Sequence, residues 1–220
     1  MQEHSFDWFS PARSDAGHRD RPAGAIQMPR NLLRVPCVKQ RTDFSCGSAA
    51  TLALLRYWRW DLYEGVDEAA LYAPLETTRA CGTEPEPIAA FLNTLAGVTA
   101  VYRNGDVTIG DLERAIDLRQ PPIVDLQACR DHELPWRTTW DAGHYVVMVG
   151  YDSERLFFMD PSTMTPGPYA YLSRAELAER WHDLTGEHNV RVEHMAIFVT
   201  GTTLPRVPDE PLPENVPRLG

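Results

Sequence analysis

Apolar residues fill the segment 46–60 almost without interruption, and Arg56 and Arg59 are its obvious polar positions. A helix with this pattern is buried nearly all round, because it has no broad polar face to present to water. Ser45 directly precedes the segment and is a residue type that caps helix N-termini. The sequence therefore predicts that a buried helix begins at Cys46.

Three further helices are predicted by a Ser or Thr that is followed three residues later by an acidic residue. This spacing is typical of a capping box, in which the two side chains satisfy backbone N–H groups at a helix start. We expect these helices to end near residues 95, 118 and 181. The three pairs are Thr83 with Glu86, Thr108 with Asp111, and Ser173 with Glu176.

Strand patterns follow later in the chain, at residues 123–126, 145–151, 156–159 and 195–200. They are short runs of Val, Ile, Phe, Tyr and Met, and the run 145–151 is apolar on both faces, as expected of a central strand. Because helices come first and strands later, the order favours an α+β domain with a helical half packed on a sheet half. A cleft between the halves is the expected place for a functional site.

The two ends of the chain have a different composition from its middle. Residues 1–30 are rich in charge, Pro and Gly without periodicity, and residues 202–220 are rich in Pro. Such segments bury little apolar surface and favour extended conformations. We therefore predict a mobile N-terminal segment at 1–30, one domain at 31–201, and an extended, mobile Pro-rich tail at 202–220.

Charge and hydropathy exclude several classes of function. The 220 residues include 31 acidic and 21 basic ones, for a net charge of -10 without a Lys/Arg cluster, which argues against a nucleic-acid partner. No apolar run reaches the roughly 18 residues of a membrane span, and the start lacks the pattern of a secretory signal. We expect a cytoplasmic protein without a membrane span.

Four cysteines are spread along the chain without a CxxC pair, so neither a zinc ribbon nor a thioredoxin-type motif is expected. We expect no cofactor and no metal ion. Disulfides are not expected either without a secretory signal. Cys46 differs from the others because it stands at a predicted helix N-terminus, where free N–H groups and the helix dipole stabilise a thiolate. Cys37, Cys81 and Cys129 are predicted to be buried fillers.

A thiolate that attacks an amide needs a donor for the oxygen that becomes negative, and a general base. Gln40 lies six residues before Cys46, and its side-chain amide is a candidate donor. His144 opens the central strand HYVVMVGY and is the candidate base. Its rival His194 also opens a strand, but no carboxylate follows it in a paired strand. Asp160 closes the strand after His144 and is the candidate for orienting the imidazole.

The Asp160 hypothesis makes a prediction about strand register. Side chains alternate faces, so His144 and Asp160 share a face only if facing residue numbers in the hairpin sum to an even value. A sum of 304 sets the two directly opposite, and 306 sets them diagonally, about 7 to 8 Å apart between backbones. Residues 152–154 would then form an odd hairpin loop.

These residues resemble a known family. The stretches SCGSAATLALLRYW, GHYVVMVGYD and FFMDPS, with Gln40 upstream, are similar to the peptidase domain of bacteriocin exporters, which cleaves double-glycine leaders and is a papain-like cysteine peptidase. The resemblance covers about residues 35–162. It implies a papain-like fold with the site in the cleft, and a peptide substrate hydrolysed through a thioester. By this resemblance Cys46 is the nucleophile, His144 the base, Asp160 the orienting acid and Gln40 the oxyanion-hole residue.

Some features depart from the family pattern. The family often has an Asp directly before its cysteine, whereas this chain has Ser45. The interval between Cys46 and His144 is long, mainly through residues 129–143, which we interpret as a lid or specificity loop. Neither a transmembrane part nor a nucleotide-binding loop follows, so the resemblance implies a free-standing relative.

Three other interpretations stay open at this stage. The thioester chemistry also fits a peptidyl transferase of the phytochelatin-synthase type, in which an amine or thiol replaces water. A catalytically silent peptide-binding module has no need of a thiolate and base together. A metal site at Cys129 and His132 lacks a second pair of ligands.

Overall fold

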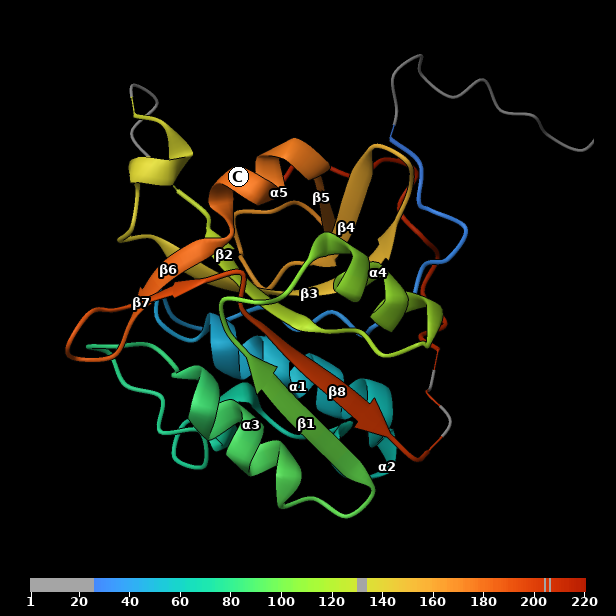
Figure 1. Ribbon diagram of the computed structural model, residues 1–220. Helices are drawn as coiled ribbons and strands as arrows, with labels where there is room; N and C mark the ends of the chain where they lie inside the picture. Colours follow the sequence, from blue (N-terminus) through green and yellow to red (C-terminus); the bar gives the residue numbers. More distant parts are fainter. Residues whose placement is uncertain (1–25, 130–133, 204, 206) are drawn as a thin grey trace, which may run out of the picture.

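A six-stranded antiparallel sheet with the strand order β1-β8-β2-β3-β4-β5 is the centre of the molecule (Figure 1). The computed structural model describes residues 26–220 apart from 130–133, 204 and 206. Strands β6 and β7 pair separately in a two-stranded ribbon. The strands are β1 (Val98–Arg103), β2 (Ile123–Gln127), β3 (Gly143–Tyr151), β4 (Arg155–Met159), β5 (Tyr169–Ser173), β6 (His182–Thr185), β7 (Val190–Glu193) and β8 (Ala196–Gly201).

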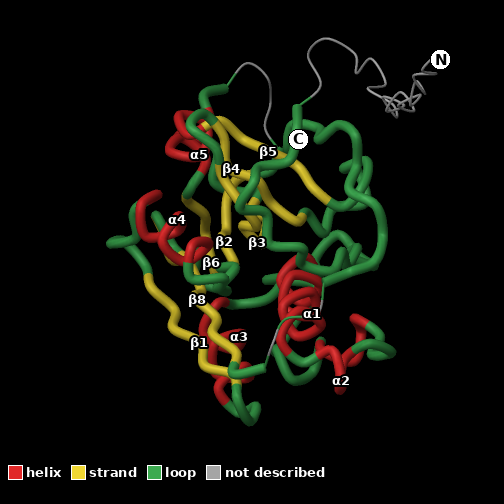
Figure 2. The backbone as a smooth tube through the Cα atoms, turned by 90° about the vertical axis from the view of Figure 1, so that its right-hand side faces the viewer, coloured by secondary structure: helices red, strands yellow, loops and turns green. Residues whose placement is uncertain are grey.

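Helices cover both faces of the sheet. Helices α1 and α4 both contact β3, and Figure 2 shows them on opposite sides of it. This arrangement explains why residues 144–150 of β3 are all buried. The helices are α1 (Cys46–Trp58), α2 (Trp60–Tyr63), α3 (Pro85–Asn93), α4 (Ile109–Asp117) and α5 (Arg174–Arg180), with 3₁₀ turns at Glu68–Leu71 and Trp136–Thr138.

The predicted helices are all present, with two corrections at their ends. Helix α1 is buried except at Cys46 and Arg56, as predicted, but it ends at Trp58 because the backbone of Arg59 leaves the helical region. Helix α4 has the predicted capping box at Thr108. Helix α3 begins one residue later than a Thr83 cap would place it, because the Thr83 hydroxyl instead bonds that of Thr77 at 2.8 Å.

All four predicted strands are present, and β1, β5, β6 and β7 were not predicted. Strand β1 lies at the edge of the sheet, and its burial alternates over its first four residues. The mixed fold of helices and an antiparallel sheet confirms the expected α+β class.

The register of the β3–β4 hairpin agrees with the sequence prediction near His144. Val147 faces Met159 and Met148 faces Phe158, so the facing numbers sum to 306, the diagonal arrangement. A bulge between Met148 and Gly150 makes the sum odd toward the tip, which the prediction did not include. The bulge lies beyond the ladder next to His144, so it leaves the diagonal arrangement there intact.

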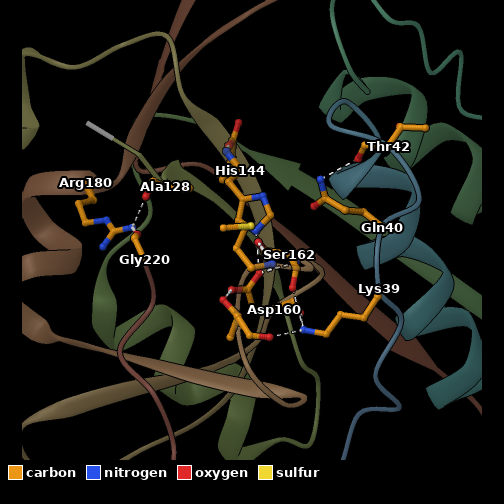
Figure 3. A network of polar contacts seen from close by, with 12 residues as sticks. Lys39, Gln40, Thr42, Ala128, His144, Asp160, Ser162, Arg180 and Gly220 are labelled. Atoms are coloured by element: carbon orange, nitrogen blue, oxygen red, sulfur yellow. Dashed lines mark hydrogen bonds and ion pairs between the residues drawn. The ribbon is translucent and has the colours of Figure 1, made fainter. Parts of the chain in front are cut away.

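The end of the Pro-rich tail lies against the domain, in contrast to the expectation of a free, mobile segment. Leu219 is 3 % exposed, and its N–H donates to the Tyr171 carbonyl on the edge strand β5 at 3.0 Å. The buried Arg180 side chain donates to the carbonyls of Leu219 and Gly220 at 3.2 and 2.6 Å (Figure 3). The tail docks through its buried apolar side chains Val216 and Leu219 and through backbone hydrogen bonds to the edge strand β5. Within the described part of the chain, no helix has the length and apolar character to cross a membrane.

Candidate active site

Cys46 is the first residue of α1 and lies against the start of β3. Gly47 makes this approach possible, because a Cβ there would lie 2.7 Å from the Thr83 Cβ and 3.2 Å from the Tyr145 ring. Burial raises the pKa of the Cys46 thiol, but the hydrogen bond and charge of His144 and the backbone N–H groups of Tyr145 and Gly47 outweigh it, so the pKa is lowered. The helix start therefore favours a thiolate.

His144 is the second residue of β3 and is 6 % exposed. Its Nε2 lies 2.7 Å from Asp160 Oδ1, and the ring also hydrogen-bonds Cys46. Burial lowers the pKa of the imidazole, but the bonds to Asp160 and Cys46 outweigh burial and raise the pKa to about 10. The imidazole therefore lies between a thiol and a carboxylate, an order that supports a thiolate–imidazolium pair.

Asp160 directly follows β4 and is 1 % exposed. Burial raises its pKa, but the bond to His144, the Thr165 hydroxyl and the Ser162 N–H outweigh burial and lower the pKa, so the carboxylate stays charged. Ser162 donates to Oδ1 at 2.8 Å and Thr165 to Oδ2. Neither donor was predicted from the sequence, although Asp-Pro-Ser is a signal for the frequent turn in which an Asp side chain accepts from the N–H two residues later.

Gln40 and Lys39 join the loop before α1 to the loop after β4 (Figure 3). The backbone N–H of Gln40 donates to the Pro161 carbonyl at 2.9 Å. The Lys39 ammonium donates to the carbonyls of Asp160, Ser162 and Thr165 at 3.0, 2.8 and 3.2 Å. No sequence signal indicated this role of Lys39, because the contacts join residues more than a hundred positions apart.

The Gln40 side chain extends toward His144 in Figure 3, and its Nε2 donates to the Thr42 carbonyl at 2.8 Å. Its Oε1 is buried without a hydrogen-bond partner among the described residues. The structure thus brings together all four residues that the sequence analysis selected: three are hydrogen-bonded in series, and Gln40 lies beside them.

The rival candidates lie elsewhere. His194 is exposed, and its ring lies 5.1 Å from that of Trp181. The prediction that the other cysteines are buried fillers is wrong, because Cys37 and Cys129 are exposed and Cys81 is partly exposed, all three in loops. His132 lies outside the described residues. Within those residues, no three His, Cys, Asp or Glu side chains are grouped to hold a metal ion.

Two cavities adjoin at this site and share Asp43, Asp141 and Gly143 in their walls. One, of 360 Å³, is lined by Cys46, by residues of the loop 79–84 and by Asp183, Leu184, Thr185 and Gly186 at the end of β6. The other, of 610 Å³, is lined by Gln40, His144 and the end of the tail. Together the two cavities form an extended groove that runs past the Cys46 thiol. An extended peptide substrate needs a groove of this kind.

Comparisons with known proteins agree with this geometry. The model of the "Peptidase_C39 like family" matches residues 32–189. No curated protein sequence matches the chain. Three solved structures share the fold at low identity, so they bear on the fold alone.

The first is a double glycine motif protease from an AMS/PCAT transporter in complex with its leader peptide, at 14% identity and a TM-score of 0.52, covering 79% of this chain and 96% of that one. The second is the peptidase domain of Streptococcus ComA, a bi-functional ABC transporter involved in quorum sensing, at 19% and 0.51, covering 76% and 99%. The third is a putative C39-like peptidase from Bacillus anthracis, at 18% and 0.54, covering 78% and 98%. The fold is thus the papain-like one of these peptidases.

Proposed function

The chain belongs to the Peptidase_C39 like family, and we propose that it is a cysteine peptidase that hydrolyses a peptide bond through a thioester on Cys46. The observation that supports this most is the hydrogen-bonded series Cys46–His144–Asp160, which begins at the N-terminus of a buried helix. A thiol, a base and a carboxylate that orients the base are the parts that nucleophilic catalysis requires.

The reaction follows from the positions of the protons. The Cys46 thiolate attacks the substrate carbonyl carbon, and the imidazolium of His144 gives its proton to the nitrogen of the leaving amine. The acyl group stays on sulfur as a thioester. Neutral His144 then takes a proton from water, and the hydroxide attacks the thioester carbon. The C–S bond breaks, the acid product leaves, and the Cys46 thiolate and the His144 imidazolium are restored. Asp160 accepts from Nε2 throughout, so it fixes the ring and stabilises its charged form.

We propose that Gln40 donates to the carbonyl oxygen that becomes negative. An amide nitrogen carries two hydrogens, and the bond to the Thr42 carbonyl uses one of them. The second N–H remains for a substrate oxygen beside the start of α1, where the first helix N–H groups have no partner within the helix.

Replacing Gln40 with alanine is expected to lower kcat by about 10²-fold with a smaller change in KM, because the amide serves the transition state. Steady-state kinetics on one peptide measures both constants. The exposed Gln27 supplies a matched control, and Gln27→Ala should leave both unchanged. A rise in KM at constant kcat would assign Gln40 to substrate binding instead.

Alkylation of Cys46 by iodoacetamide should begin well below the pH at which an ordinary thiol reacts, because its pKa is lowered. The peptidase rate should rise as the thiolate–imidazolium pair forms, and fall when the pH passes about 10 and His144 loses its proton. Mass spectrometry must assign the label, since Cys37 and Cys129 are exposed. An alkylation curve at Cys46 that follows that of Cys129 contradicts an activated pair.

We propose leader-peptide processing as the activity, from the likeness to a structure of a double glycine motif protease with its leader peptide. The test is to map the cleavage of peptides with and without a Gly-Gly pair by mass spectrometry. Trapping the acyl-enzyme separates the alternatives. A thioester resolved by an added amine rather than by water indicates a transferase, and a Cys46 without selective reactivity indicates a silent binding module.

A further inference from the structure

The smaller of the two cavities at the site has a strongly acidic wall. Cys46 lines it, so whatever binds there lies next to the thiol. Among the described residues of the wall, Arg79 is the one cation, against the acids Asp43, Glu84, Asp125, Asp141 and Asp183. The wall of the larger cavity has a more balanced charge, because it contains Arg41 and Arg218 as well as acidic residues. We call the part of the smaller cavity around Glu84, Asp125, Tyr145 and Asp183 the acidic recess.

Asp183 is held in the acidic recess by specific contacts. It lies in β6, and its Oδ1 accepts from Gln127 Nε2 at 2.7 Å. Gln127 is fixed in turn, because its Oε1 accepts from the Ala142 N–H at 3.0 Å. A Cβ at Gly143 would lie 1.8 Å from Asp183 Oδ2, so only glycine before His144 lets this carboxylate lie against β3.

Asp125 is a second buried carboxyl in the same place. It is 1 % exposed and faces Tyr145 across the β2–β3 pair, so the two side chains share a face. Its Oδ1 accepts from the His144 N–H at 3.1 Å. Its Oδ2 has no N–H or O–H donor among the described residues. The Asp125 carboxyl also lies within hydrogen-bond distance of the Asp183 carboxyl. Such a contact between two carboxyl groups requires a shared proton.

The two carboxyls repel each other in a buried place. Burial and the charge of Asp183 raise the pKa of Asp125 well above its usual range, and burial raises the pKa of Asp183 to about 6. Burying carboxyl groups without a cation is costly, and proteins rarely retain such a group without a use for it.

The Tyr145 hydroxyl is a further polar group without a partner. Tyr145 is 5 % exposed, its oxygen is buried, and no described residue bonds it. Burial and the negative charges of Asp125, Cys46, Asp183 and Glu84 raise its pKa, which places the hydroxyl among these acids. One wall of the cavity thus holds a hydroxyl without a partner and a carboxylate oxygen without an N–H or O–H donor among the described residues. Together they indicate a ligand that donates hydrogen bonds and carries positive charge.

We propose that the acidic recess binds a Lys or Arg side chain of the peptide substrate, close to the bond that Cys46 attacks. This inference rests on the proposed function and names a feature of its substrate. The ammonium or guanidinium group donates to Asp183, to Asp125 Oδ2 and to the Tyr145 oxygen. Among the described residues, no three His, Cys, Asp or Glu side chains of the recess are grouped to hold a metal ion.

The test measures binding in the Cys46→Ala protein, so that no turnover is needed. The probes are N-acetylated, C-amidated peptides that carry Lys, its uncharged analogue norleucine, or Glu at each of successive positions. Calorimetry should show, for one position, binding of the Lys peptide at least about tenfold tighter than binding of the norleucine peptide, as close charge pairs in desolvated sites provide.

Asp183→Asn, added to Cys46→Ala, should remove this preference without weakening the binding of the norleucine peptide. The partly exposed Glu84 gives a second variant, Glu84→Gln, in case Asp183→Asn does not fold. The control is Asp106→Asn, which removes one exposed carboxylate outside both cavities. In all variants the unfolding midpoint reports whether the fold is kept.

The outcomes separate this inference from the proposed function. Equal binding of Lys and norleucine peptides, or binding of neither, overturns the inference. So does a preference that requires a free α-amine, because that cation is not a side chain. Selective Lys binding by a protein whose wild-type form cleaves none of these peptides supports the recess and contradicts the peptidase. Cleavage without any preference for Lys or Arg supports the peptidase and contradicts the recess.

Discussion

Replacing Cys46 with alanine is expected to lower the rate of peptide hydrolysis by about 10⁴-fold or more, because no other nucleophile takes over its step. Cys46 lies at the edge of the core and is only partly exposed, so losing its sulfur removes little packing. The unfolding midpoint and circular dichroism spectrum should therefore stay close to those of the unchanged protein. Measuring kcat/KM and the midpoint together separates a chemical loss from a folding loss.

Cys81 provides a matched control for that experiment. It also lines the cavity beside Cys46, but it lies in a loop and not at a helix start. Cys81→Ala should keep nearly full activity. If Cys81→Ala loses the activity and Cys46→Ala keeps it, the nucleophile is Cys81, and the helix N-terminus has no catalytic role.

Local patterns in the sequence were sufficient for the parts of the site that lie within one element. The buried stretch after Ser45 placed Cys46 at a helix start, and two apolar runs with a turn between them placed His144 and Asp160 in one hairpin. Side-chain alternation then limited the register to even sums, and the sum of 306 observed near His144 is one of the two that were predicted. These features are readable because each depends on residues that are close in the chain.

Contacts between distant segments had no such signal. The Lys39 ammonium reaches carbonyls after β4, and Asp125 and Asp183 meet although 58 positions separate them. An isolated Asp in an apolar strand such as IVDLQ predicts a polar residue facing water, yet Asp125 is buried. Only the pairing of β2 with β3 and the approach of β6 bring these carboxyls together, and neither follows from periodicity.

The end of the tail is a similar case. Its prolines predict an extended chain, which is correct locally, but they give no information on whether it docks. The docking depends on the buried Leu219 side chain and on the carbonyls to which Arg180 donates. Arg180 lies 39 positions before Leu219, so no local pattern connects the two. The prediction from composition alone therefore treated the tail as separate from the domain, although the end of the tail packs on it.

Replacing Asp160 with asparagine is expected to lower kcat by about 10²- to 10⁴-fold, because an amide can hold the imidazole but not stabilise its charge. Asp160 Oδ1 lies 2.7 Å from His144 Nε2, and this bond is one reason why the pKa of His144 is raised to about 10. Without the carboxylate that pKa should fall. The thiolate–imidazolium pair should then occupy a narrower pH range, and the alkaline limb of the rate profile should move to lower pH.

The pH profile distinguishes this effect from a merely structural one, because Asp160 also accepts from Ser162 and Thr165. Thr165→Val removes one of these donors and keeps the carboxylate, so it should lower kcat far less and leave the alkaline limb in place. Iodoacetamide labelling of Cys46 across the same pH range gives a reading that does not depend on substrate. If Asp160→Asn and Thr165→Val lower kcat equally and neither shifts the profile, Asp160 shapes the loop after β4 and another group supports the charge on His144.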